Sequence, residues 1–229
     1  MDRGILNRNI QRTLPSARIL ETGLPLCPEI RLSLISADNM KRQFSPDEIR
    51  RIQQKTPYWS FCWASGQAMA WFILKNRPLF EGKSILDFGS GSGIVAIAAA
   101  MAGAKEVAAC DSDRDAIDAT EVNAALNGVR VNTCESLEEV PMECHMILTA
   151  DVLYDRENYG LLERFLEYAP EVFVADSRLK TIDVTPYRRI TQITTTTIPD
   201  LHEGDEFNHV NIYRAGNSSA ILDGITGLT

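Results

Sequence analysis

The stretch that most constrains the fold of this chain is 84–93, which reads Ser-Ile-Leu-Asp-Phe-Gly-Ser-Gly-Ser-Gly. A short apolar run leads to Asp87, three alternate glycines follow, and residues 94–100 are rich in alanine and have good helix propensity. This order predicts a strand, a tight loop and a helix. Glycines serve such a loop where the backbone takes positive φ or where a ligand approaches the main chain. The loop is therefore either a ligand cradle at a helix start or an ordinary strand-to-helix turn.

The spacing of the glycines excludes two common nucleotide loops. Counted from Gly89, the dinucleotide fingerprint places Ile94 where its last glycine belongs, and the Gly-Lys-Ser/Thr of a phosphate loop is absent from the stretch. The carboxylate of Asp87 is unfavourable beside a pyrophosphate and favourable beside an ammonium or a sulfonium. These features favour S-adenosylmethionine as the ligand, with Asp87, Gly89, Gly91 and Gly93 as its binding residues.

Two acidic positions further along mark a nucleoside site. Asp111 follows Gly91 by twenty residues at the end of the next apolar run, where a carboxylate accepts hydrogen bonds from ribose hydroxyls. The alternative for Asp111 is a cap on the following helix. Glu135, after the third predicted strand, is the candidate for the adenine end of the site, and Glu138 and Glu139 compete for that role.

A second motif, Asp151-Val152-Leu153-Tyr154, follows the fourth predicted strand. In open α/β sheets, ligands bind at this edge. A carboxylate is a suitable partner for the ammonium of lysine, so Asp151 is the candidate for capturing and orienting an amine, and Tyr154 for shaping the acceptor site. The alternative is that Asp151 caps a loop on which Tyr154 packs.

Aromatic residues precede the glycine loop, in the stretch 57–67. Trp59 and Trp63 either line a channel for cofactor and lysine or belong to the core, and the channel would provide desolvation and a π face for a cation. Gly66 is a candidate for close approach of the backbone to the cofactor.

Asp87-x-Gly89-x-Gly91-x-Gly93 resembles motif I of the seven-stranded Rossmann-like S-adenosylmethionine-dependent methyltransferases, in which this loop wraps the methionine part of the cofactor. Asp151-x-x-Tyr154 resembles the motif that names one group of protein lysine methyltransferases. Residues 24–214 are similar to the branch of that group that modifies the β-subunit of electron transfer flavoprotein. One departure is Ala175-Asp176-Ser177-Arg178-Leu179, which stands where this branch has Gly-Asp-Pro-Gly-Arg.

The resemblance implies an α/β, Rossmann-like seven-stranded methyltransferase fold: a mostly parallel sheet with an antiparallel C-terminal hairpin and helices on both faces. It implies an S-adenosylmethionine-dependent protein lysine N-methyltransferase that acts on the β-subunit of electron transfer flavoprotein. The alternatives are methylation of ribosomal protein, methylation of a small nitrogen compound such as nicotinamide, and a non-catalytic cofactor-binding interaction protein.

The remaining elements follow from periodicity and caps. Strands are expected at 106–111, 129–134, 145–150 and 172–175, helices at 113–127 and 159–168, and a closing hairpin at 187–198 and 207–213. The expected boundaries are a flexible N-terminal extension (1–23), the methyltransferase domain (24–214) and a C-terminal tail (215–229). Within the domain, 24–78 form an N-terminal cap with the helix that leads into the core, and 79–214 form the core. Ser45 with Glu48 predicts a capped helix start.

Charge and cysteine content limit the partners and the compartment. The net charge of -8 argues against non-specific nucleic-acid binding, although residues 1–60 alone carry ten Lys/Arg and six Asp/Glu. The five cysteines include no Cys-x-x-Cys, and the three histidines form no ligand-like cluster, so no metal and no membrane partner is expected. A reducing, cytoplasmic location is predicted. The arginines within 1–20 leave an organelle transit peptide as the alternative.

Overall fold

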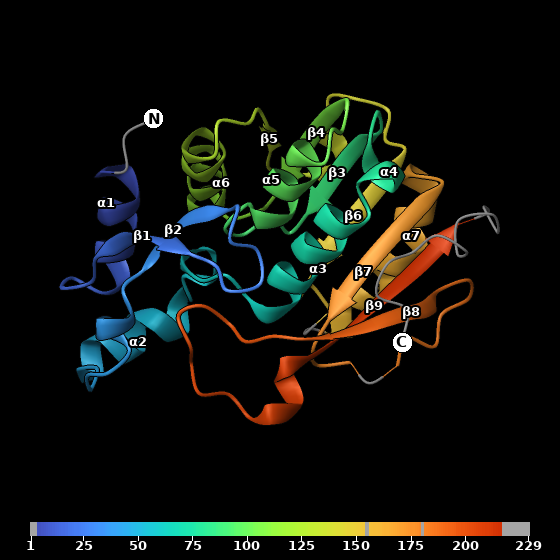
Figure 1. The fold of residues 1–229 in the computed structure, drawn as a ribbon. Helices are drawn as coiled ribbons and strands as arrows, with labels where there is room; N and C mark the ends of the chain where they lie inside the picture. The colour runs from blue at the N-terminus through green and yellow to red at the C-terminus, as the bar shows by residue number, and fades with distance from the viewer. Residues whose placement is uncertain (1–3, 154–155, 180, 217–229) are drawn as a thin grey trace.

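A seven-stranded sheet forms the centre of the computed structural model, which describes residues 4–153, 156–179 and 181–216 (Figure 1). The strand order is β5-β4-β3-β6-β7-β9-β8. The parallel strands are β3 (Ser84–Phe88), β4 (Glu106–Cys110), β5 (Asn132–Cys134), β6 (Met146–Ala150) and β7 (Glu171–Asp176). The antiparallel hairpin consists of β8 (Arg188–Thr194) and β9 (His209–Gly216). The predicted fold class is confirmed.

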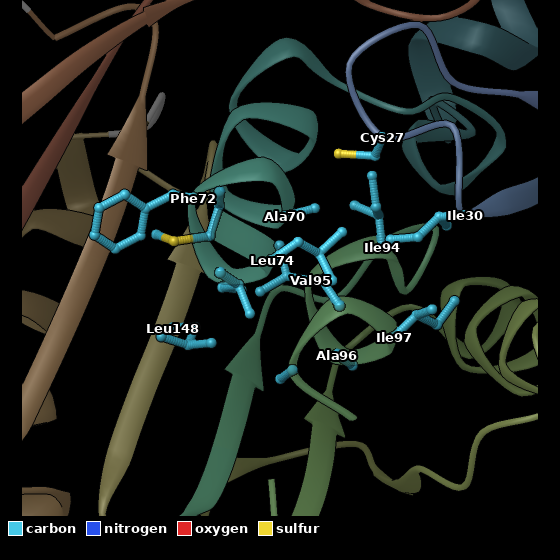
Figure 2. Close-up of a cluster of buried hydrophobic side chains, with 14 of the residues drawn as sticks. Cys27, Ile30, Ala70, Phe72, Leu74, Ile94, Val95, Ala96, Ile97 and Leu148 are labelled. Carbon is cyan, nitrogen blue, oxygen red and sulfur yellow. The ribbon is translucent and has the colours of Figure 1, made fainter. Parts of the chain in front are cut away.

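Helices cover both faces of this sheet because side chains alternate between the two faces along each strand. On one face, Ile85 of β3 and Leu148 of β6 pack with α3 (Ala64–Lys75) and α5 (Ile94–Met101), as Figure 2 shows for Leu148. On the other face, Leu86 and Ile147 pack with Leu162 and other residues of α7 (Leu161–Tyr168). The near-continuous apolar strands follow from this double burial.

Between β4 and β5 lies α6 (Arg114–Leu126), and several short helical turns connect other elements. They are α4 (Arg77–Phe80), η1 (Ala37–Asn39), η2 (Tyr58–Ser60), η3 (Leu137–Glu139), η4 (Arg156–Gly160) and η5 (Asp205–Asn208). The third strand begins later than predicted, since Val129 donates its amide to Ala124 and completes the end of α6 instead of pairing with β4.

The N-terminal part of the chain differs from the predicted flexible extension over 1–23. Residues Gly4–Thr13 form α1, and Ile19–Gly23 form β1, which pairs antiparallel with β2 (Arg31–Ile35). Leu6 and Ile10 are fully buried in one cluster with Trp59 and with residues of α6. The prediction is wrong for 4–23 because this apolar stripe packs against α6. Of the predicted tail, 215 and 216 belong to β9, and 217–229 lie outside the described residues.

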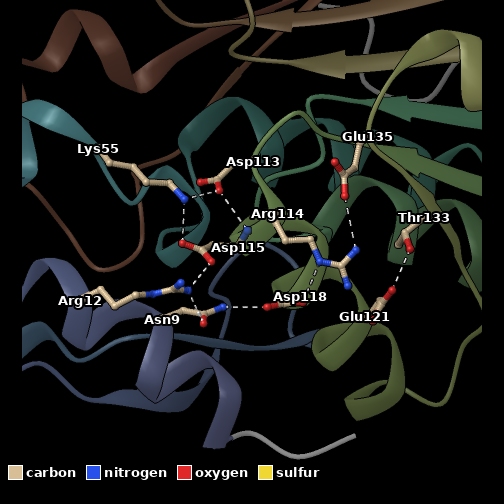
Figure 3. A network of polar contacts seen from close by, with 10 residues as sticks. All are labelled: Asn9, Arg12, Lys55, Asp113, Arg114, Asp115, Asp118, Glu121, Thr133 and Glu135. Carbon is tan, nitrogen blue, oxygen red and sulfur yellow. Dashed lines mark hydrogen bonds and ion pairs between the residues drawn. The ribbon is translucent and has the colours of Figure 1, made fainter.

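Polar contacts fix the N-terminal layer to the acidic side of α6 (Figure 3). Asn9 donates to Asp118 at 2.9 Å, and Arg12 contacts Asp115 at 2.6 Å. Lys55 contacts Asp115 at 2.9 Å and Asp113 at 2.8 Å.

Lys55 itself follows α2 (Pro46–Gln54). The capping box of α2 forms as predicted: the Ser45 hydroxyl accepts from the Glu48 amide, and the Glu48 carboxylate accepts from the Ser45 amide. Two of the basic residues of the segment 1–60, Arg12 and Lys55, thus serve to dock the N-terminal layer onto α6.

Candidate functional site

A cavity of about 760 Å³ opens at the carboxyl ends of β3, β4, β5 and β6, where the strand order reverses. It is lined by residues from the glycine loop, from the segments after β4, β5 and β6, and from the aromatic stretch before α3. They are Tyr58, Trp59, Trp63, Phe88, Gly89, Gly91, Cys110, Asp111, Ser112, Asp113, Ala116, Glu135, Ser136, Leu137, Glu138, Ala150, Asp151, Val152, Asn158, Leu161, Arg164 and Arg178.

Main-chain hydrogen bonds hold the glycine loop against the neighbouring strand. The amides of Gly89 and Ser90 both donate to the carbonyl of Cys110, at 2.8 and 3.2 Å. Gly93 has φ 81°, and a Cβ there would lie 2.9 Å from the Cα of Thr120, so this position requires glycine. Gly91, at φ 51°, differs because a Cβ there would meet nothing within 4 Å, although the residue lines the cavity. The open space beside Gly91 fits a ligand that approaches the backbone.

Asp87 takes a different place from the one expected beside a sulfonium. It is buried beneath the loop, it is not among the described residues that line the cavity, and its carboxylate accepts from the amide of Ala96 at 3.0 Å. Gly93 precedes α5 without a side chain to cap it, so the acid of the preceding strand caps the helix instead. Burial raises the pKa of the Asp87 carboxyl to about 7. In this geometry Asp87 holds the start of α5, and its contact with a cofactor stays a prediction.

Asp111 lines the cavity directly after β4, as the sequence predicts for a ribose-binding acid. One carboxylate oxygen accepts from the amide of Gly91 at 2.9 Å, and the other from the amide of Asp113 at 2.9 Å. The helix cap of α6 is Asp113, whose side chain accepts from the amide of Asp115. Burial raises the pKa of Asp111. Its role toward ribose stays a prediction, and its contact with Gly91 joins it to the glycine loop.

At the predicted adenine end, Glu135 and Glu138 both line the cavity, so the geometry keeps both candidates. Glu135 contacts Arg114 at 3.6 Å, and Glu138 pairs with Arg164. The side chains of Glu135 and Glu138 are more than half exposed. Leu137, which sequence reasoning did not single out, is buried between them and supplies an apolar surface suited to a base.

Trp59 and Trp63 both line the cavity, yet they differ in burial. Trp59 is 1% exposed and packs in the cluster under α1, so both predicted alternatives, core and channel wall, describe it. Trp63 lies closer to solvent and donates its ring N–H to the carbonyl of Tyr58 at 3.0 Å. Gly66 lies away from the cavity: a Cβ there would meet Ile94 of α5 at 3.1 Å, so this glycine permits α3 to pack on α5.

Asp151 lines the cavity directly after β6, two strands along the sheet from β4, and has a left-handed conformation with φ 54°. Its carboxylate oxygen Oδ1 accepts from the hydroxyl of Ser65 at 2.6 Å and from that of Ser177 at 3.3 Å. Desolvation raises the pKa of this half-buried carboxyl to about 6, although the bond from Ser65 opposes the shift. Tyr154, the other predicted acceptor residue, lies outside the described residues.

Sequence reasoning missed several residues that surround Asp151. Ser65, Ser177 and Arg178 come from the start of α3 and from the segment after β7, far from Asp151 along the chain. Arg178 lines the cavity, pairs with Glu203 at 2.7 Å and stacks on Phe207 at 4.6 Å. The departure at 175–179 from the related branch was the one signal that pointed to this segment.

The described residues contain no group of three or more His, Cys, Asp or Glu that could hold a metal ion. All five cysteines are free and buried. In the described part of the chain, no helix combines the length and apolarity needed to span a membrane.

Comparison with known proteins agrees with this geometry. Residues 68–156 match the family described as ribosomal protein L11 methyltransferase. The chain is 43% identical over 105 residues to the electron transfer flavoprotein beta subunit lysine methyltransferase homolog of Caenorhabditis elegans, an alignment that covers 46% of this chain and 42% of the relative. It is 33% identical over 159 residues to the corresponding lysine methyltransferase of Rattus norvegicus, covering 66% of this chain and 61% of the relative. The chain thus spans about half the length of these relatives.

Among solved structures, magnesium protoporphyrin IX methyltransferase from Synechocystis PCC 6803, with S-adenosylmethionine bound, superposes with a TM-score of 0.50. The alignment covers 78% of this chain and 88% of that one at 14% identity, which bears on the fold alone. The resemblance found in the sequence is confirmed: the chain has the fold of the seven-strand methyltransferases, and its sequence is similar to that of the electron transfer flavoprotein β-subunit lysine methyltransferases.

Proposed function

We propose that this chain is an S-adenosylmethionine-dependent protein lysine N-methyltransferase that acts on the β-subunit of electron transfer flavoprotein in the cytoplasm. The observation that carries the proposal is that one cavity joins the glycine loop and Asp111 to the carboxylate of Asp151. The same cavity therefore contains both the candidate cofactor site and a carboxylate suited to binding an amine. The relatives' names support the substrate, and the five free thiols are in keeping with a reducing compartment.

The residues present fit the cofactor. The open space beside Gly91 admits a ligand against the main chain, Asp111 offers a carboxylate for ribose hydroxyls, and Leu137 offers an apolar surface for the base. When bound, S-adenosylmethionine supplies a methyl group on a positively charged sulfur, which is already activated for transfer. The chain therefore needs no nucleophile of its own, and its task is positioning.

The acceptor side must bind a lysine and allow it to lose a proton. Deprotonation of the lysine ammonium at pH 7 costs about 4–5 kcal/mol, because the pKa of free lysine is near 10.4. Burial of the side chain among Tyr58, Trp63 and Phe88 would lower that pKa through desolvation. The Asp151 carboxylate binds the ammonium and orients the nitrogen, and the proton leaves through water.

The test is a transfer assay with isotope-labelled S-adenosylmethionine and purified electron transfer flavoprotein. We expect label on a lysine of the β-subunit, located by mass spectrometry of its peptides. Label that is absent from lysine while the chain binds the cofactor would contradict the proposal.

A second candidate substrate is ribosomal protein L11, since the matching family model covers both the glycine loop and Asp151. The same assay with purified L11 separates the two substrates. Transfer to L11 at a higher kcat/KM than to the flavoprotein would favour this candidate.

A further inference from the structure

Asp151 is held by two hydroxyl groups that come from distant parts of the chain. Ser65 belongs to the first turn of α3, and Ser177 follows β7. Both donate to the same oxygen, Oδ1, and no other described side chain is bonded to Oδ2. The amide of Asp151 donates to the carbonyl of Ala175 at 3.1 Å, which fixes the main chain as well. Within the described residues, the protein therefore occupies one oxygen of the carboxylate, and no side chain bonds to the other.

The two hydroxyls do not hold Asp151 equally. Ser65 is fully buried and lies 2.6 Å from Oδ1, whereas Ser177 is half-exposed and lies 3.3 Å away. A hydrogen bond from a buried hydroxyl to a charged oxygen is shorter and stronger than one between neutral groups. Moreover, α3 is packed against α5 through Gly66, so the position of the Ser65 hydroxyl is set by the core. The dominant constraint on the carboxylate is therefore Ser65.

We propose that Ser65 is a positioning residue for lysine capture: its hydroxyl fixes Oδ1 of Asp151, keeps the carboxylate charged and directs Oδ2 to the substrate ammonium. The inference rests on the proposed lysine methyltransferase activity. It assigns to α3 a part in the acceptor site, although this helix otherwise serves the core.

The charges around Asp151 make the effect of Ser65 dependent on pH. Asp176 at the end of β7 raises the pKa of Asp151, and Arg178 lowers it. Cys62, in the segment before α3, is uncharged because burial raises the pKa of its thiol. The Ser65 and Ser177 hydroxyls lower the Asp151 pKa by hydrogen bonding, and desolvation keeps it near 6. Loss of the Ser65 donor therefore moves the pKa of Asp151 toward neutral pH.

The experiment compares Ser65→Ala with wild type over pH 6 to 9, with the β-subunit of electron transfer flavoprotein and labelled cofactor. We expect kcat/KM at pH 7 to fall about tenfold or more, mainly through KM for the protein substrate. The ratio of variant to wild type should rise toward pH 9, where the carboxylate is charged in both proteins. Ser177→Ala is the matched control, with a smaller loss and the same trend.

Cofactor affinity of Ser65→Ala should match that of wild type, because the cofactor does not contact the acceptor carboxylate. Its thermal stability at pH 7 should fall modestly, since the buried Oδ1 loses a donor, and the assay is therefore run well below the unfolding temperature of the variant. A loss that is equal at every pH would indicate a merely structural role and would overturn the proposal. An unchanged rate would do the same.

A second measurement tests the role of Ser65 without any turnover. The pKa of Asp151 is read from carboxyl 13C NMR titration, with the resonance assigned through Asp151→Asn. We expect a higher pKa in Ser65→Ala, and an unchanged pKa overturns the positioning role. If wild type does not methylate the flavoprotein, the proposed substrate fails, while this titration still decides the part played by Ser65.

Discussion

The two halves of the cavity are held in different ways. In the cofactor half, which comprises the glycine loop and Asp111, the main chain supplies most of the order: two loop amides donate to Cys110, and Gly91 donates to Asp111. In the acceptor half, which comprises Asp151, Ser65, Ser177 and Arg178, side chains from separate segments hold one carboxylate. Backbone hydrogen bonds tolerate many side-chain changes, whereas a side-chain network depends on each member.

The difference predicts how each half responds to substitution. In the acceptor half, removal of a side chain should impair turnover and leave the fold and cofactor binding intact. In the cofactor half, a change that disturbs the main chain should impair binding and stability together. Substitutions in both halves therefore test whether the halves are separate in function.

The largest effect is expected for Asp151→Ala. Loss of the carboxylate removes the partner of the ammonium, so the lysine is no longer oriented, and turnover should fall at least about 100-fold. Cofactor affinity, measured by isothermal titration calorimetry, should stay within about twofold because Asp151 follows β6, two strands along the sheet from β4, which precedes Asp111. Asp151 has a left-handed backbone, which alanine adopts with strain and asparagine tolerates. Asp151→Asn is therefore the control that separates backbone strain from loss of the carboxylate. A joint loss of cofactor binding in both variants would show that the halves are coupled.

The next largest effect is expected for Gly93→Ala. The positive φ and the Thr120 Cα at 2.9 Å from the new Cβ should lower the free energy of unfolding by about 2–3 kcal/mol. Gly91→Ala should lower the free energy of unfolding by only about 1 kcal/mol, since its Cβ meets no atom within 4 Å. It should nevertheless weaken cofactor binding at least as much as Gly93→Ala does. Urea denaturation and calorimetry measure the two quantities.

Gly128→Ala is the control for these glycine variants. Gly128 also has positive φ and open space around it, but it follows α6 away from the cavity. It should show the stability loss of Gly91→Ala with wild-type cofactor affinity. Equal binding by Gly91→Ala and Gly128→Ala would mean that the loop does not approach the cofactor.

The sequence predicted the cofactor half better than the acceptor half for a physical reason. Strand, glycine loop and helix are adjacent in the chain, and the acid after β4 stands at a regular distance from them, so local pattern is sufficient. Ser65 and Ser177 reach Asp151 only because α3 and β7 lie beside β6 in the fold. Periodicity in the sequence does not predict contacts between segments that are distant along the chain.

Two misplacements have a similar origin. Asp87 precedes the loop and seemed suited to a cation, but alternation along β3 turns it under α5, where the amide of Ala96 lacks a partner in its own helix. The segment 4–23 looked poorly anchored because its apolar stripe is short. Its stability comes from a surface of α6 more than one hundred residues away in sequence.

The burial of Asp87 leads to a third prediction, on the pH dependence of stability. Its pKa rises from 3.8 to about 7 in the folded state, so the folded protein holds this proton more tightly than the unfolded chain does. The stability from this group is fully present below pH 3.8 and is lost as pH rises through about 7. Asp87→Asn keeps an oxygen for the Ala96 amide and removes the titration. Relative to wild type, the variant should gain about 3 kcal/mol between pH 4.5 and 7.5.

Urea denaturation at these two pH values measures the change for wild type and for Asp87→Asn. Thr149→Val, a variant of a buried and uncharged residue on the neighbouring strand, is the control and should follow the wild-type pH dependence. A pH dependence that is the same with and without Asp87 would show that the carboxyl titrates normally in spite of its burial.

The smallest effect is expected where the N-terminal layer meets the cofactor half. Lys55 pairs with Asp113 and Asp115, but its side chain is 56% exposed, so Lys55→Met should cost about 0.5 kcal/mol of unfolding free energy. The difference should disappear in 0.5 M salt because solvent screens the pair. Arg50→Met, which removes a fully surface pair with Asp47 on α2, is the control and should show no measurable loss. A loss above 1 kcal/mol that persists in salt would mean that charge, as well as the apolar cluster under α1, fixes the layer that carries Tyr58 and Trp59 to the cavity.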